Sequence, residues 1–165
     1  FGNMLKSSGD FSFQNRNRRP PKDPVNSVLS YLYGILAKEL FSTVLAAGFD
    51  PYLGFYHQPR YGRPALALDM MEEFRPIIAD SSALTLFNKD ELAGNDFIRT
   101  GIGISLAADA RRKVIAGYER RMQSEVVHPI FGYKLSYRRI LEVQARLLAR
   151  VLSGEINEYP AFVTR

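Results

Sequence analysis

Residues 23–48 read DPVNSVLSYLYGILAKELFSTVLAAG, and the apolar side chains of this stretch recur at the spacing of an α-helix. Asp23 followed by Pro24 is a strong start signal, because the aspartate can accept hydrogen bonds from the first turn and proline suits the first helical position. Gly48, with Pro51 soon after it, ends the pattern. The apolar positions are Val25, Val28, Leu29, Leu32, Ile35, Leu36, Leu40 and Val44. The stretch therefore predicts a long, largely buried helix of about six turns.

A helical period returns after a segment rich in glycine and proline, residues 49–64, which should form a shaped loop or a short helix. The new stripe consists of Leu66, Met70, Phe74 and Ile77. Pro76 lies inside this period, and we expect it to kink the helix because proline removes a hydrogen bond and crowds the preceding turn.

Two more helices are predicted at about 106–127 and 136–153. Between them and the earlier helices, residues 96–105 are β-branched, apolar and interrupted by glycine, which favours a short β-hairpin or an irregular loop. The sequence therefore predicts an all-α, multi-helix fold with at most one short hairpin near 96–105.

Residues 1–22 precede the first helix and contain turn formers and tandem prolines, so we expect an extended or looped arm, or the end of an upstream helix. Phe11 and Phe13 are interpreted as anchors of this arm in the core. Residues 23–165 are predicted to form one helical domain. The chain begins with Phe1 rather than Met, and we expect it to be a fragment of a longer protein.

The composition is 46% hydrophobic and 24% charged, as in an ordinary folded domain. The absence of cysteine excludes disulfides, thiolate zinc sites and cysteine nucleophiles. We see no secretory signal and no long apolar run, so we predict no membrane span and a cytoplasmic location. Residues 111–165 carry eleven Lys and Arg against five Asp and Glu, and this basic surplus favours a polyanionic partner.

One cluster combines a histidine with carboxylates. His57 lies in the loop, and Asp69, Glu72 and Glu73 follow at helical positions i, i+3 and i+4, which share a face. Such a group is stabilised by a divalent cation, and histidine with carboxylates suits Mn²⁺ better than Mg²⁺. The alternative is a solvated helix face beside a surface histidine, and spacing alone does not decide between them.

Basic residues lie near this cluster and in the arm. Arg60 and Arg63 follow His57 closely, and we interpret them as contacts to a nucleic-acid phosphate. The arm contributes three more candidates for DNA binding, Arg16, Arg18 and Arg19.

Four strings of the chain resemble, in order, the helical domain of the CRISPR spacer-acquisition integrase family. They are RPPKDPVNSVLSY from residue 19, AAGFDPYLGFYH from residue 46, RYGRPALALDMMEEFRP from residue 60, and SYRRILEVQARLLAR from residue 136. The resemblance covers essentially the whole chain.

The resemblance implies a metal-dependent DNA endonuclease and integrase that uses Mn²⁺ or Mg²⁺. Its catalytic and metal-binding residues would be His57 and Glu72, with Asp69 supporting the site and helping to activate the attacking group. The family's remaining glutamate ligand and its β-sandwich would precede Phe1. We therefore expect the fragment alone to be inactive.

The implied reaction is attack of a DNA 3′-hydroxyl on a phosphodiester, which inserts a new spacer into a CRISPR array. The implied partners are double-stranded DNA (the spacer precursor and the CRISPR repeat), a second copy of the chain and a small CRISPR partner protein, in a prokaryotic cytoplasm. Two other hypotheses remain: a non-catalytic DNA-binding or assembly module, and an RNA-processing nuclease.

Overall fold

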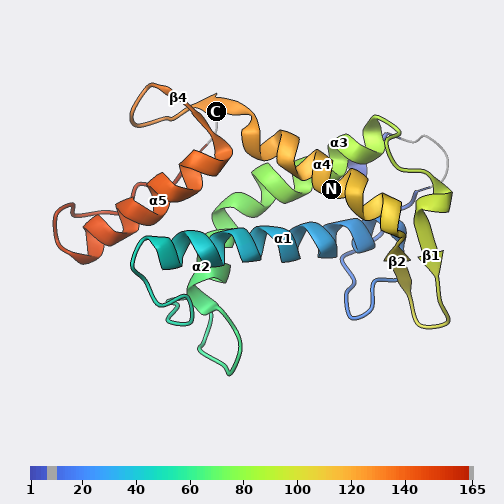
Figure 1. Ribbon diagram of the computed structural model, residues 1–165, viewed down its shortest axis with the longest axis horizontal. Helices are drawn as coiled ribbons and strands as arrows, with labels where there is room; N and C mark the ends of the chain where they lie inside the picture. Colours follow the sequence, from blue (N-terminus) through green and yellow to red (C-terminus); the bar gives the residue numbers. More distant parts are fainter. Residues whose placement is uncertain (7–10, 164–165) are drawn as a thin grey trace. The chain divides into compact units, whose positions relative to one another are not determined.

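The structure, a computed structural model, describes residues 1–6 and 11–163 (Figure 1). Helices dominate the described residues, and the strands among them form two short antiparallel pairs. The fold is therefore mostly helical, as the sequence predicts.

The chain divides into two compact units, and each is described by itself below. Unit 1 comprises Phe1–Ile35 and Pro76–Arg121, and unit 2 comprises Leu36–Arg75 and Met122–Arg165.

Helix α1 (Pro24–Ala46) forms where the long apolar period predicts it. The carboxylate of Asp23 accepts a hydrogen bond of 2.8 Å from the N–H of Asn26, so the predicted cap is confirmed. Gly48 adopts φ +91°, a left-handed conformation that ends the helix. Six residues of the predicted stripe are 0% exposed: Val25, Val28, Leu32, Leu36, Leu40 and Val44.

Of the helices in the described chain, α1 alone is long and apolar enough to cross a membrane, judged by length and composition. The helix nevertheless carries Lys38 and Glu39 in its interior, and Glu39 forms an ion pair of 2.8 Å with Arg138. A buried apolar stripe beside charged positions is the pattern of a helix that packs within a protein core.

The helical hydrogen-bond ladder changes at Pro76, the position where the sequence predicts a disturbance. Helix α2 (Ala65–Phe74) gives way to a π-helical segment, Arg75–Asp80, before α3 (Ser81–Asn88) begins. Proline has no N–H to donate to the preceding turn, and π-helical segments occur where the α-helical ladder is interrupted.

Unit 1 packs α3 against α4 (Ala108–Gln123). A Cβ atom added at Gly117 would lie 2.8 Å from Cδ2 of Leu86, so the glycine permits close packing of the two helices. The guanidinium of Arg121 donates a hydrogen bond of 2.8 Å to the carbonyl of Ile77.

The predicted hairpin is present in unit 1. Strand β1 (Phe97–Arg99) pairs with β2 (Ile104–Leu106). Before β1, the buried carboxylate of Asp96 receives two hydrogen bonds from Lys113 of α4, at 2.8 and 2.9 Å. This ion pair ties the hairpin to the helix.

The predicted arm, residues 1–22, includes residues 7–10, which lie outside the described part of the chain. Its described residues hold one short 3₁₀ helix, Gly2–Met4. The ring of Phe11 packs 5.0 Å from that of Phe87 and 5.6 Å from that of Phe97, as expected for a core anchor. Phe13 instead packs against Phe1, at 5.2 Å.

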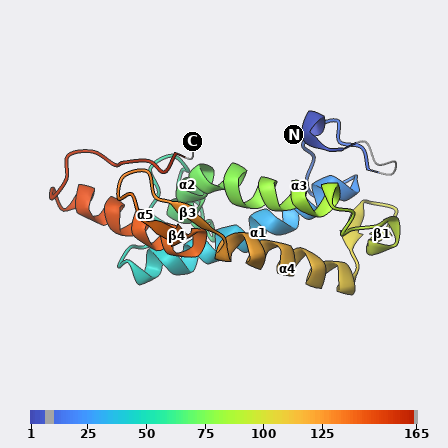
Figure 2. The same cartoon turned by 90° about the horizontal axis from the view of Figure 1, so that it is seen from above.

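Unit 2 contains a second hairpin that the sequence analysis did not predict. Strand β3 (Glu125–Val127) pairs with β4 (Lys134–Ser136), which leads into α5 (Tyr137–Leu152; Figure 2). The prediction of a helix up to residue 127 was therefore wrong in its last turn, because α4 ends at Gln123 and the β-branched pair that follows enters a strand.

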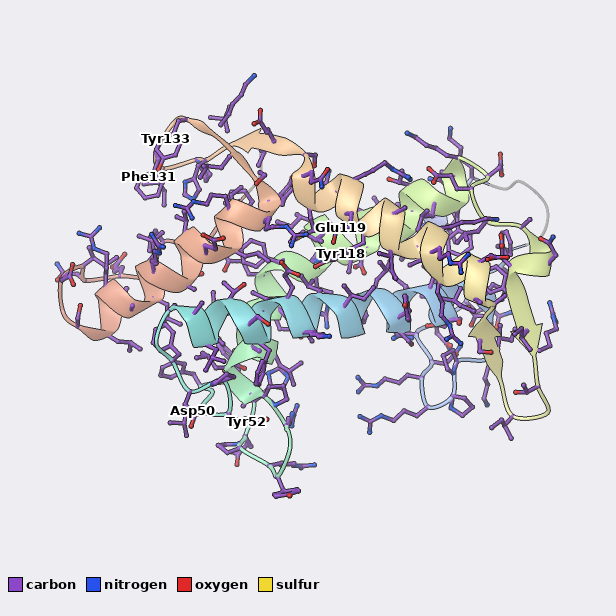
Figure 3. All side chains as sticks on the ribbon, in the orientation of Figure 1. Asp50, Tyr52, Tyr118, Glu119, Phe131 and Tyr133 are labelled. Carbon is purple, nitrogen blue, oxygen red and sulfur yellow. The ribbon has the colours of Figure 1, made fainter. Side chains whose placement is uncertain are left out.

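The turn of this second hairpin presents aromatic side chains to solvent. The rings of Phe131 and Tyr133 stack with centroids 5.7 Å apart and project from the turn (Figure 3). His128 packs beneath them, 4.7 Å from Phe131, and is 0% exposed. The imidazole thus belongs to the core of unit 2.

Candidate metal centre

The loop that carries His57 passes directly over one face of α2. The carboxylate of Asp50 accepts a hydrogen bond of 2.9 Å from the N–H of Tyr52, which starts the turn. The N–H of Leu66 donates to the carbonyl of Pro51, also at 2.9 Å. At Gly54 a Cβ atom would lie 2.7 Å from Oδ2 of Asp69, so glycine is required for this close approach.

Asp69 is the anchor of the loop. Its Oδ2 accepts hydrogen bonds from the N–H groups of Phe55, at 2.6 Å, and Tyr56, at 3.0 Å. Its Oδ1 accepts from the N–H of His57, at 2.9 Å, and contacts Nδ1 of the same residue, at 2.6 Å. The side chain is 9% exposed. Burial raises the pKa of Asp69, but these four contacts outweigh it and hold the pKa below its usual value.

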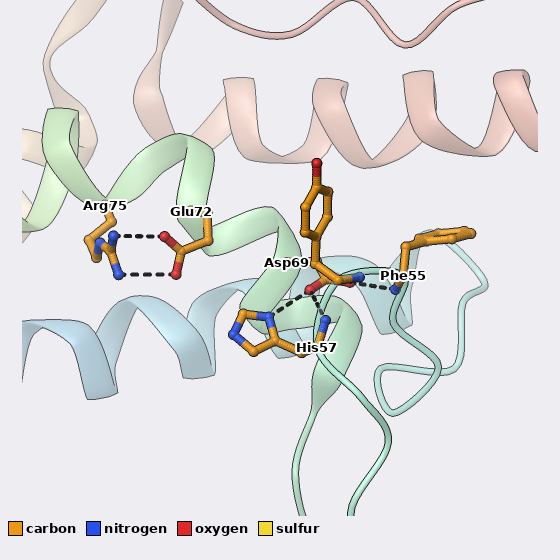
Figure 4. Close-up of polar contacts among 6 residues, drawn as sticks. Phe55, His57, Asp69, Glu72 and Arg75 are labelled. Atoms are coloured by element: carbon orange, nitrogen blue, oxygen red, sulfur yellow. Dashed lines mark hydrogen bonds and ion pairs between the residues drawn. The ribbon is translucent and has the colours of Figure 1, made fainter.

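The contact with Asp69 sets the orientation of the imidazole (Figure 4). An ionised carboxylate can only accept, so Nδ1 of His57 carries the proton and donates it. In the neutral ring Nε2 then presents a lone pair, and it points away from Asp69. A histidine held in this way by a carboxylate is oriented as metal-ligating histidines are.

Glu72 lies one turn further along α2, on the same face as Asp69. Its carboxylate pairs with the guanidinium of Arg75 through contacts of 2.7 and 3.0 Å, and its side chain is 45% exposed. An exposed pair of this kind is weak, so a divalent cation would compete with Arg75 for the carboxylate.

The predicted set of carboxylates does not act as one cluster. Glu73 points elsewhere and is partly buried against Tyr159, Gln144 and Phe162. Burial raises the pKa of Glu73, and the hydrogen bonds that it accepts oppose this rise. Within residues 1–6 and 11–163, no three His, Asp or Glu side chains stand close enough to hold a metal ion as they are.

The spacing of residues along α2 already indicates that Glu73 and Glu72 have different surroundings. Glu73 follows Met70 by three residues and Leu66 by seven, so it borders the apolar stripe of the helix, whereas Glu72 does not. The prediction that Glu73 belongs to the same acidic cluster as Asp69 and Glu72 is therefore wrong.

A pocket of about 530 Å³ lies beside Asp69 in unit 2. Its walls come from three parts of the chain: the loop (Phe55, Tyr56), the helices (Leu66, Asp69, Met70, Glu73, Leu148) and the segment after α5 (Tyr159, Ala161, Phe162, Val163). The lining is mostly apolar, and Tyr56 at its edge is 91% exposed.

The candidate DNA contacts fall into two groups. Arg60 and Arg63 lie in the same loop as His57, where the N–H of Arg63 donates to the carbonyl of Arg60 at 2.9 Å across a tight turn. Arg60 is exposed and Arg63 is half-buried.

The other three candidates belong to unit 1. Arg18 and Arg19 are exposed. Arg16 donates to the side chains of Asn26, at 2.6 Å, and Ser30, at 2.9 Å, and its guanidinium lies 5.3 Å from the ring centre of Tyr33. Arg16 thus already stabilises the arm against α1.

The chain is similar to known proteins over nearly all of its length. The family model described as "CRISPR associated protein Cas1" matches residues 1–120. A CRISPR-associated exonuclease Cas4/endonuclease Cas1 fusion of Geobacter sulfurreducens is 59% identical over 170 residues, covering 100% of this chain and 30% of that protein. A CRISPR-associated endonuclease Cas1 of Thermus thermophilus is 46% identical, covering 94% of this chain and 47% of that protein.

Solved structures share the fold. A CAS1 protein from Thermotoga maritima superimposes with a TM-score of 0.84 at 25% identity, over 93% of this chain and 48% of that one. A partial Cas6-RT-Cas1–Cas2 complex contains a chain with a TM-score of 0.80 at 30% identity, over 99% of this chain and 48% of that one. The chain therefore spans less than half the length of these proteins.

Proposed function

Because this chain belongs to the CRISPR-associated Cas1 family, we propose that it carries metal-binding residues of a DNA endonuclease and integrase. One observation supports this proposal above all: Asp69 holds Nδ1 of the His57 ring, which leaves Nε2 available to a metal ion, and Glu72 follows Asp69 by three residues on the same helix. The alternative was a solvated helix face beside a surface histidine. Such an arrangement does not require one carboxylate to accept hydrogen bonds from both the imidazole and the backbone of its loop.

The residues present fit Mn²⁺ or Mg²⁺. Nε2 of His57 and the carboxylate of Glu72 are the proposed ligands, and Asp69 supports the histidine. Two protein ligands leave coordination positions for water and for a phosphate oxygen, as hard divalent cations require. When bound, the ion would stabilise negative charge on the phosphate and lower the pKa of an attacking hydroxyl.

The basic residues of the loop and of the arm would bind the DNA backbone and orient it at the metal centre. Arg60 and Arg63 would contact the DNA backbone, and Arg18 and Arg19 would contribute a second basic contact from the arm. The proposed reaction is attack of a 3′-hydroxyl of the spacer precursor on a phosphodiester of a CRISPR repeat. The new phosphodiester bond joins the precursor to the array, and the bond broken in the repeat strand releases a 3′-hydroxyl. Correct placement of hydroxyl and phosphate accounts for much of such a rate enhancement.

The proposed partners are double-stranded DNA, a second copy of the chain and a small CRISPR partner protein, in a prokaryotic cytoplasm. The complex with Cas2 among the similar structures supports the third of these. The family resemblance places a further glutamate ligand outside residues 1–165, so we propose that the chain alone binds Mn²⁺ weakly and cleaves little DNA.

The proposal is tested by titrating Mn²⁺ into the chain and following thermal unfolding. A site filled at a hundredfold excess over Kd stabilises by about 2.7 kcal/mol, which raises the Tm of a domain of this size by about 5–11 °C. We expect this shift in the wild type and its loss in His57→Ala and Glu72→Gln.

Glu142→Gln is the matched control. Glu142 pairs with Arg139 across i, i+3 on α5 and is 42% exposed, so its replacement removes a similar ion pair from a different place. Equal shifts in Glu72→Gln and Glu142→Gln would refute the metal site and favour a non-catalytic DNA-binding or assembly module. Strong DNA cleavage that survives His57→Ala would refute the catalytic role of the site.

A further inference from the structure

The chain after α5 turns back along that helix (Figure 2). We call residues 156–163 the strap. Its main apolar anchor is Phe162, which is 4% exposed. The ring of Phe162 stacks on that of Phe74 of α2 at 6.0 Å and lies 5.5 Å from His128 and 6.3 Å from Tyr137.

The polar anchor of the strap is the carboxylate of Glu73. Oε2 accepts a hydrogen bond of 2.7 Å from the hydroxyl of Tyr159. Oε1 accepts from the side-chain amide of Gln144, at 3.1 Å, and from the N–H of Phe162. The same amide of Gln144 also donates to the hydroxyl of Tyr159, at 2.9 Å, and to the carbonyl of Pro160, at 3.1 Å.

This carboxylate joins the strap to the helix that carries the proposed metal centre. Glu73 immediately follows Glu72 and lies one turn beyond Asp69, so a rotation of α2 that displaced one would displace all three. Tyr159 and Phe162 of the strap line the same pocket as Phe55 and Tyr56, which belong to the loop that Asp69 holds.

A partly buried carboxylate is costly to maintain, and a neutral side chain of similar shape could form hydrogen bonds with the same three partners. A glutamine could accept from Phe162 and Gln144 through its carbonyl and donate to the hydroxyl oxygen of Tyr159. The arrangement therefore needs a hydrogen-bonding group of this length at position 73, whether charged or neutral.

We propose that Glu73 is a positioning residue: through the strap it fixes the rotation of α2, and thereby holds Asp69 where it orients the ring of His57. This role rests on the proposed function, since the oriented ring is the proposed metal ligand. Glu73 itself binds neither the metal nor the DNA.

The test compares Glu73→Ala, which removes the anchor, with Glu73→Gln, which keeps it. The first readout is the Nδ1 proton of His57 in ¹⁵N-histidine-labelled protein, recorded without metal. The chain has two histidines, so His57→Ala assigns the signal. The second readout is hydrogen exchange at the amide of Phe162, which reports whether the strap is bound. The third is the Kd for Mn²⁺.

We expect Glu73→Ala to release the strap, to abolish the protected Nδ1 signal and to weaken Mn²⁺ binding about tenfold, the lower end of the range for groups that support metal ligands. Glu73→Gln should retain the Nδ1 signal, the slow exchange at Phe162 and the wild-type Kd. A residue that only stabilised the fold would lower the Tm without changing the Nδ1 signal.

Loss of the strap with an unchanged Nδ1 signal would overturn the proposal, and so would a Glu73→Ala protein in which the strap stays bound. If Glu73→Ala does not fold, Phe162→Ala replaces it, because this change loosens the strap and leaves the sequence of α2 intact. Failure of the wild type to bind Mn²⁺ would remove the proposed function, whereas the metal-free Nδ1 result would still decide whether Glu73 positions the ring.

Discussion

Replacement of Asp69 gives the most informative test of the site, because one carboxylate accepts from four N–H donors. Asp69→Ala leaves without a partner the backbone N–H groups of Phe55, Tyr56 and His57, together with Nδ1 of the histidine. The loop over α2 would lose its main polar attachment.

The expected cost follows from the donors and their exposure. A hydrogen bond to a charged acceptor contributes about 1.5–3 kcal/mol. The donors on Phe55 and Tyr56 are exposed, so water replaces much of what they lose, whereas those on His57 are partly buried. We therefore expect a loss of about 3 kcal/mol in the free energy of unfolding, or about 6–12 °C in Tm.

The isosteric change Asp69→Asn should be nearly as harmful as Asp69→Ala. Both oxygens of Asp69 accept hydrogen bonds from N–H groups. In asparagine one of these oxygens becomes an NH₂ group, which cannot accept and would lie against the same N–H groups. Glu73→Gln provides the contrast, because the hydroxyl of Tyr159 can accept as well as donate and so accommodates an amide.

The assay is urea and thermal unfolding in the presence of a chelator, so that metal binding does not contribute. Glu72→Gln is the control for loss of a negative charge on the same helix face, and it should change stability by less than about 0.5 kcal/mol. If Asp69→Asn is as stable as the wild type, the reasoning that a carboxylate anchors the loop is wrong.

Two further outcomes follow from close contacts and buried charge. Gly54→Ala should destabilise the protein by about 1–3 kcal/mol, because the added Cβ would meet Asp69. Gly34→Ala should stabilise it by about 0.5–1 kcal/mol, because Gly34 lies inside α1 with open space around it. Equal effects of the two changes in thermal unfolding would contradict this. Burial raises the pKa of Asp96, but its hydrogen bonds from Lys113 and a backbone N–H hold it below its usual value. The stability contributed by Asp96 is therefore present above its unfolded pKa of about 3.9 and is lost as the pH falls through the lower pKa of the folded state. Asp96→Asn should be destabilising at pH 7 and much less so at pH 3. If urea unfolding gave the same loss of stability at both pH values, the pH dependence would not come from Asp96.

Features that depend on neighbouring residues could be predicted from the sequence. The start of α1 at Asp23, its end near Gly48 and the disturbance at Pro76 all arise from backbone donors, acceptors and φ angles within a few residues. The apolar stripe of α1 was equally readable, because burial of one helix face imposes a period on the sequence.

The second hairpin was not readable in the same way. Val126 and Val127 continue an apolar pattern that begins in α4, and nothing local distinguishes another helical turn from a short strand. The strand exists because it pairs with residues 134–136, which lie across a turn that closes around the buried ring of His128.

The partners of the carboxylates on α2 were decided by tertiary structure. Asp69, Glu72 and Glu73 share a helix face by spacing, and the place of Glu73 beside the apolar stripe indicates burial but not which residues its carboxylate meets. Asp69 became the support of the imidazole because the loop was folded back onto it, and Glu73 became a buried anchor because a segment 86 residues later reached it. Local spacing determines which side chains share a helix face, but only the distant chain that packs there determines which charge is buried, which is bonded and which stays open to solvent.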